Sequence, residues 1–228
     1  MVQNSTDFIG PSRLPKLKAA AHELRFLLSR NYPRKSSVEF VGNHHQLKKD
    51  ERNILFRGVF TPHVSNTIRR GKILFKDLIG RTLVIDAYNV TITLENALRS
   101  RPLIKGNDGF IRDISGTFRG FRQSDLTFKA WELIMKLLMQ YSPKKVIVLI
   151  DRPYSKSALF AHSLNRWFRH RGLNGKAILS NNVDRELKIT KDVRATSDSN
   201  ILVHGGPSLD LAGHIATRRL NHRPFIVP

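Results

Sequence analysis

Two short, almost wholly apolar segments constrain the fold of this chain most strongly, because each of them runs directly into an aspartate. Thr82–Ile85 is followed by Asp86, and Val146–Ile150 is followed by Asp151. Between them, Ser124–Tyr141 carries apolar residues at three- and four-residue spacing, which predicts an amphipathic helix. Apolar strands separated by a helix are typical of a parallel sheet that is covered on both faces. The predicted fold class is therefore α/β with a mainly parallel central sheet.

Two later segments repeat this pattern of a strand that finishes close to an acid. Lys176–Ser180 is a predicted strand near Asp184, and Val193–Thr196 is a predicted strand near Asp198. Ligands of open α/β sheets bind at the carboxyl ends of the strands, and these acids are expected to lie there. Carboxylates gathered at one edge raise each other's pKa unless a cation compensates. Oxygen ligands without Cys suit Mg²⁺ or Mn²⁺. For Asp86 the alternative role is the N-cap of the next helix, and the sequence leaves both roles open.

The first part of the chain has a helical pattern instead. Apolar residues from Leu17 to Leu28 recur at helical spacing, and two shorter helical segments follow before Thr61. Such a triplet is interpreted as a packing or docking module rather than a DNA-binding helix-turn-helix, because no recognition helix is identifiable. The predicted organisation begins with a flexible tail (1–11) and a small all-α domain (12–62). A linker (63–80) and an α/β domain (81–228) follow.

Composition indicates a polyanionic partner. Lys and Arg number 39 against 18 Asp and Glu, which gives a formal net charge of +21 and a pI near 11.0. A field of this sign attracts phosphate polymers, so nucleic acid is the expected partner. No segment resembles an amphipathic membrane anchor, a signal peptide or a membrane span, so a cytoplasmic protein is expected. The chain has no Cys, which excludes disulfides and thiolate metal sites, and its nine His residues show no ligand spacing.

Several motifs together resemble a known group of nucleases. VIDAYNV (84–90) is similar to the first-strand motif of the PIN-like and NYN nuclease superfamily, in which an Asp is followed three residues later by Asn. TSDSNIL (196–202) resembles the later Ser-Gly-Asp-Ser-Asp signature of that superfamily, and NNVDREL (181–187) stands where its Lys-Gly-x-Asp element lies. The whole chain resembles an uncharacterised, mainly archaeal family that joins a small helical N-terminal domain to a PIN-like domain. That resemblance rests on LLSRNYPRKSSVEFVGNHHQLKKDERNILFRGV, DAYNV, NDGFIRD, DRPYSKS and ATSDSNI.

The resemblance implies a three-layer α/β/α fold and metal-dependent cleavage of RNA. Carried over to this chain, it implies that the metal ligands, directly or through water, are Asp86, Asp184 and Asp198. Asn89 would orient the site, and Asp151 is a supporting catalytic candidate. Asp108, in the NDGFIRD element, is a supporting metal-ligand candidate, whereas Asp113 ranks lower because its neighbour Arg112 suggests a structural ion pair. The candidates for contacts with RNA are Arg112, Arg119, Arg122, Arg152, Lys156, Arg166 and Arg169.

Two departures from the superfamily pattern keep a second function open. Asn200 stands where a second Asp is frequent, and Asn107 precedes Asp108 where an acid is expected. Both changes remove negative charge and so weaken cation binding. The first hypothesis is an endoribonuclease dependent on Mg²⁺ or Mn²⁺. The second is a non-catalytic RNA-binding factor associated with ribosomal RNA or ribosomal particles, and a homo-oligomer is left open. Dinucleotide binding is not supported, because no G-x-G-x-x-G follows the first strand.

Overall fold

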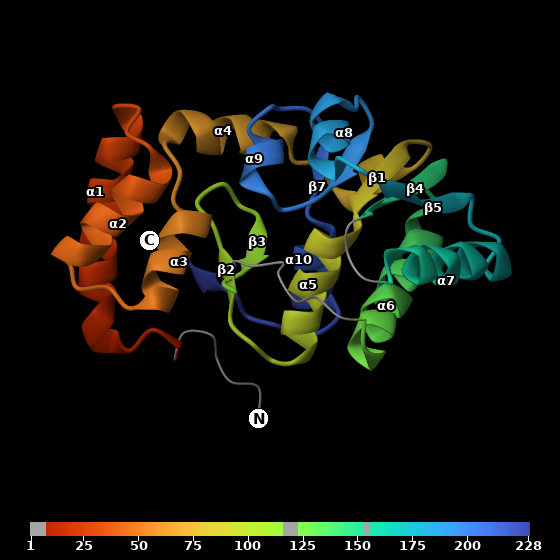
Figure 1. Ribbon diagram of the computed structural model, residues 1–228, viewed down its shortest axis with the longest axis horizontal. Helices are drawn as coiled ribbons and strands as arrows, with labels where there is room; N and C mark the ends of the chain where they lie inside the picture. The colour runs from red at the N-terminus through yellow and green to blue at the C-terminus, as the bar shows by residue number, and fades with distance from the viewer. Residues whose placement is uncertain (1–7, 116–122, 153–155) are drawn as a thin grey trace.

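The computed structural model describes residues 8–115, 123–152 and 156–228. A helical N-terminal region is followed by an α/β domain (Figure 1). Figure 1 shows α1 and α2 at one end of the molecule and β4, β5 and α7 at the other. Helix α4 leads from the first part to the second, and its Ile68 packs with Leu202 of α9. The predicted fold class is confirmed.

Four helices form the N-terminal region, after the short 3-10 helix η2 (Pro11–Arg13). They are α1 (Leu14–Ser29), α2 (Arg34–His44), α3 (Lys49–Gly58) and α4 (Pro62–Gly71). The apolar stripe of α1 is buried against α2 and α3, as its spacing predicts. The segment predicted as a linker is largely helical, because Thr61 caps α4 and η3 (Phe75–Leu78) follows it. The part of the predicted tail that is described also packs, since Ile9 is buried.

The central sheet has five parallel strands in the order β5-β4-β1-β6-β7. They are β1 (Thr82–Asp86), β4 (Lys145–Asp151), β5 (Gly175–Ser180), β6 (Val193–Ala195) and β7 (Ser208–Leu209). Strand β1 is in the middle, which explains its apolar composition: Ile85 is paired with Val148 on one side and Ala195 on the other.

Helices cover both faces of this sheet and complete three layers. One face carries α5 (Ala87–Leu98), α6 (Asp125–Tyr141), α7 (Ser157–His170) and α10 (Leu211–Arg218). The other face carries the shorter helices α8 (Val183–Ile189) and α9 (Ser199–Leu202). Helix α5 begins directly after β1, and α9 begins directly after Asp198.

A small second sheet joins the two parts of the molecule. It has the order β3-β2-β8 and consists of β2 (Leu103–Lys105), β3 (Ile111–Asp113) and β8 (Phe225–Ile226). Three apolar residues on or beside this sheet, Ile104, Phe225 and Val227, lie in the same core as helices α1–α3. The helical region therefore shares a hydrophobic core with the α/β domain. Within the described residues, no helix has both the length and the apolar character needed to cross a bilayer.

Candidate functional site

The candidate site lies at the carboxyl edge of the central sheet, where the strand order reverses. Strand β1 is followed by β4 on one side, whereas β6 and β7 continue on the other. The segments after β1 and β6 therefore diverge at this edge, which is the position at which open α/β sheets bind ligands. Asp86 ends β1, and Thr196 to Asp198 follow β6.

Asp86 is held by both neighbouring segments. Its Oδ1 accepts a hydrogen bond from the backbone N–H of Asn89 at 3.2 Å, and its Oδ2 accepts one from the hydroxyl of Thr196 at 3.0 Å. The first contact makes Asp86 the N-cap of α5, so the capping role is confirmed. The second contact links the carboxylate to the loop after β6, which a cap does not require.

Asn89 holds the same loop in place. Its Oδ1 accepts hydrogen bonds from both the backbone N–H and the hydroxyl of Ser197, at 2.8 and 3.0 Å. The backbone N–H of Asp198 in turn donates to the hydroxyl of Thr196 at 3.2 Å. Asn89 acts here through the loop, which it fixes beside the end of β1.

Four aspartates influence one another at this edge. The pKa of Asp86 is raised to about 7: burial is the largest cause, the negative charges of Asp198 and Asp151 add to it, and the hydrogen bonds from Asn89 and Thr196 oppose it. Burial and the charge of Asp184 raise the pKa of Asp151. Burial and the charge of Asp198 raise the pKa of Asp184. The structure thus brings together the carboxylates of β1, β4, α8 and the loop after β6.

The described residues provide no ion-pair partner for this acidic edge, which we define as Asp86, Asp151, Asp184 and Asp198. Among the described residues, no Lys, Arg or His nitrogen lies within 4.0 Å of these four carboxylates. Lys188 lowers the pKa of Asp184, but it forms no ion pair with it. Unpaired carboxylate oxygens are the donors that Mg²⁺ and Mn²⁺ prefer. The acidic edge does not supply three ligand atoms that all lie within 4.8 Å of one another.

Asp108 and Arg112 are placed differently from the prediction. Asp108 is fully buried, and its Oδ1 accepts a hydrogen bond from the guanidinium of Arg112 at 2.9 Å. The same guanidinium donates from Nε to the carbonyl oxygen of Ser197 at 2.6 Å. Because this ion pair is buried, neither residue can take the role predicted for it. Asp108 is not placed to bind a metal ion, and Arg112 is not placed to contact RNA. Arg112 instead helps to position the loop that carries Asp198.

Two other residues of the NDGFIRD element also have structural partners. Asp113 forms an ion pair with Arg57 at 3.3 Å, not with Arg112 as its sequence position suggested. The side-chain amide of Asn107 exchanges hydrogen bonds with the backbone of Phe60, at 2.8 and 3.1 Å. The Asn at position 107 therefore takes no charge away from the acidic edge. Asn200 is exposed beside Asp198, and its backbone N–H donates to that carboxylate at 2.8 Å.

The remaining basic candidates fall into two groups. Arg152 and Lys156 are exposed, directly after Asp151 and at the start of α7, whereas Arg166 and Arg169 are exposed farther along that helix. Arg119 and Arg122 lie outside the described residues.

Sequence reasoning missed a cavity beside the acidic edge. A cavity of about 330 Å³ is lined by Asn89 and Asp198 on one side and by Arg34, Phe56 and Arg57 of α2 and α3 on the other. Burial, together with the nearby positive charge of Arg112, lowers the pKa of Arg34 to about 10. The N-terminal helices thus form one wall of the candidate site. No local signal could reveal this wall, because its residues precede Asn89 by more than 30 positions.

Two further features lie near β7. Asp210 directly follows this strand, but it is paired with Lys72 at 3.0 Å and caps α10, so it is not part of the acidic edge. A second cavity, of about 710 Å³, extends from Lys72 along α10 and is rich in basic side chains, including Lys76, Lys105 and Arg218.

This molecule is an α/β protein with a helical N-terminal region and an acidic carboxyl edge. It belongs to the family described as "Domain of unknown function (DUF5616)", whose model matches residues 75–214. The model described as "Protein of unknown function (DUF434)" matches residues 16–71. The chain is similar to the uncharacterised protein MJ0935 of Methanocaldococcus jannaschii, with 30% identity over 186 residues that cover 82% of this chain and 88% of that protein. No solved structure matches. These matches confirm the predicted pairing of a helical region with an α/β domain in an uncharacterised family.

Proposed function

We propose that this protein is a PIN-like endoribonuclease that depends on Mg²⁺ or Mn²⁺. The observation that carries the proposal is the acidic edge: burial and neighbouring carboxylates raise the pKa of Asp86, Asp151 and Asp184, and no ion pair accompanies the edge in the described part of a chain whose net charge is +21. Such an arrangement is costly unless a cation balances it. Strongly perturbed acids in one place mark a functional-site candidate.

The residues of the chain have distinct tasks in this proposal. Asp86 is buried and fixed from two sides, so it would present an oxygen ligand in a defined position. Asp198 and Asp184 would complete the ligand set, directly or through water, while Asp151 would add negative charge. A divalent cation supplies a Lewis acid for the phosphodiester and lowers the pKa of an attacking water. Asn89 would keep the loop after β6 at the distance that these roles need.

The surroundings support RNA as the substrate. Arg152 and Lys156 are exposed next to Asp151 and could contact phosphates. In the cavity beside Asp198, Phe56 is 44% exposed and presents an aromatic surface next to Arg57. Aromatic and basic side chains together bind single-stranded nucleic acid by stacking and charge. We therefore propose a single-stranded segment as the substrate, with one nucleotide in this cavity.

A cleavage assay with matched variants tests the proposal. Purified protein should cut a fluorescent single-stranded RNA in Mn²⁺ and not in EDTA. Asp86→Asn and Asp198→Asn should each lower the rate by at least about 100-fold, because each removes one charge from the ligand set. Asp192→Asn, an exposed acid outside the acidic edge, is the control and should keep the wild-type rate. No cleavage in Mn²⁺, or equal cleavage by Asp86→Asn, would reject the nuclease.

The second candidate is a non-catalytic factor that binds RNA or ribosomal particles. The net charge of +21 favours it, as does the uncharged Asn200 beside Asp198. Co-sedimentation with ribosomal particles that persists to high salt, together with no cleavage, would support this function. It predicts that Asp86→Asn leaves RNA affinity unchanged. Loss of RNA binding at modest salt would reject both candidates.

A further inference from the structure

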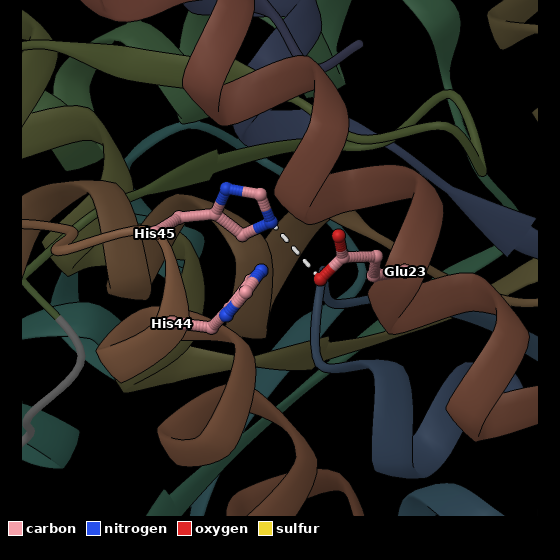
Figure 2. Close-up of side chains that lie close together, drawn as sticks. All are labelled: Glu23, His44 and His45. Atoms are coloured by element: carbon pink, nitrogen blue, oxygen red, sulfur yellow. Dashed lines mark ion pairs between the residues drawn. The ribbon is translucent and has the colours of Figure 1, made fainter.

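A second cluster of metal-ligating side chains lies in the N-terminal helices, away from the acidic edge. It consists of Glu23 on α1, His44 at the end of α2, and His45 directly after it. One potential ligand atom from each residue lies within 4.8 Å of the other two. Figure 2 shows the three side chains pointing toward one another from two segments of the chain. We propose that they bind a Zn²⁺ ion.

The contact between His45 and Glu23 is the first argument. Nε2 of His45 and Oε2 of Glu23 are 2.9 Å apart (Figure 2). This nitrogen is nevertheless buried without a hydrogen-bond partner among the described residues. A buried ring nitrogen beside a carboxylate, without a hydrogen bond to satisfy it, is a suitable site for a cation that binds both atoms.

The donor set is the second argument. Two imidazoles and one carboxylate are a known ligand set of Zn²⁺ sites that leave the fourth position for water. With bonds of about 2.0–2.2 Å to each ligand, the ligand atoms would have to draw closer together than the present limit of 4.8 Å. His44 is exposed and Glu23 is 41% exposed, so rotamer changes of these two side chains can close the gap.

The backbones that carry the ligands are already fixed. Ala20, Ala21 and Leu24 on α1 pack in one core with Val41 of α2. The backbone of the ligand His45 is held as well, because its N–H donates to the carbonyl oxygen of Val41 at 3.0 Å. A site built on packed helices is more defined than one on loops. A bound ion would tie α1 to the turn between α2 and α3.

The test uses the untagged Asp86→Asn protein as background, so that the acidic edge contributes as little as possible. Calorimetry should show about one Zn²⁺ per chain, and Co²⁺ should give the visible spectrum of a four-coordinate complex. Adding His45→Ala or Glu23→Ala should weaken Zn²⁺ binding by more than about 10-fold, because even the loss of an outer-shell partner costs about 10–100-fold. His22→Ala, an exposed His beside Glu23, is the matched control and should change nothing.

A second readout guards against variants that are merely misfolded. Zn²⁺ should raise the melting temperature of the background protein and not that of His44→Ala, whose exposed side chain leaves the core untouched. An ordinary ion pair between His45 and Glu23 would give no Zn²⁺-dependent shift. The proposal is overturned if Zn²⁺ does not bind, or if His22→Ala weakens binding as much as His45→Ala does.

Discussion

Two groups of acids lie on either side of the loop after β6, and they differ in whether a basic side chain accompanies them. On one side Asp86 and its neighbours on the acidic edge have no ion pair among the described residues. On the other, Asp108 is paired with Arg112, and Asp113 is paired with Arg57. Both groups contain buried carboxylates, so burial alone does not separate them.

The difference separates structural acids from candidate ligands. A paired acid is neutralised within the fold, and breaking its pair leaves a buried charge behind. An unpaired acid in a cluster destabilises the fold at neutral pH, and it persists where function requires it. Ser197 lies between the two groups, because Arg112 contacts its carbonyl oxygen and Asn89 accepts from its N–H and hydroxyl. The paired group therefore positions part of the unpaired one.

The largest expected effect comes from breaking the paired group. Asp108→Ala leaves the guanidinium of Arg112 buried without its carboxylate and should lower the free energy of unfolding by about 3–5 kcal/mol. Urea unfolding followed by circular dichroism measures this change, with exposed Asp192→Ala as the control. A loss below about 1 kcal/mol would mean that the pair is not structural.

The acidic edge should respond to pH in the opposite sense from ordinary paired acids. The pKa of Asp86 rises from 3.8 to about 7 on folding. The folded state therefore binds the proton more tightly, and stability falls as pH rises from about 4 to 7. The difference between these pKa values corresponds to at most about 4 kcal/mol.

The comparison with Asp86→Asn isolates this contribution. In EDTA the variant should become more stable than the wild type as the pH rises through this window, because its neutral amide has no charge to bury. Thermal unfolding of both proteins from pH 4 to pH 8 measures the difference. Parallel curves would show that Asp86 carries no buried charge.

The smallest expected effect concerns the basic residues beside the acidic edge. Arg152→Ala and Lys156→Ala should each weaken binding of single-stranded RNA, and each should reduce the salt slope of log affinity by about 0.7. Fluorescence anisotropy over a salt series measures both quantities. Exposed Lys18 on α1 provides the control Lys18→Ala. Equal losses for all three variants would place RNA contacts over the whole surface rather than beside the acidic edge.

Sequence patterns predicted the parts of this molecule that depend on local periodicity. Helix α6 and strands β4 and β5 lie within two residues of their predicted limits, because apolar spacing and turn residues determine them. The small second sheet was not predicted, because its strands are two or three residues long. Strand β8 pairs with β2, which lies about 120 residues earlier in the chain, and a local sequence pattern cannot indicate so distant a partner.

The candidate site shows the same limit. Asp86, Asp151, Asp184 and Asp198 were found because each follows a strand, and parallel strands bring their ends together. Asp210 also follows a strand of the same sheet, but it forms an ion pair with Lys72 and therefore does not belong to the acidic edge. Asp108 and Arg112 were misassigned because their pairing depends on side-chain directions that the spacing of the NDGFIRD element does not specify. The wall formed by Arg34 and Phe56 depends on how the N-terminal helices dock.

Anomalous diffraction from crystals soaked in Mn²⁺ tests the central claim most directly. If the acidic edge is a divalent-cation site, an anomalous peak should lie between Asp86, Asp184 and Asp198, about 2.0–2.4 Å from at least one carboxylate oxygen. The same peak should be absent from crystals of Asp86→Asn. Well-ordered crystals of the wild type with no peak at the carboxyl edge of the sheet would contradict the account.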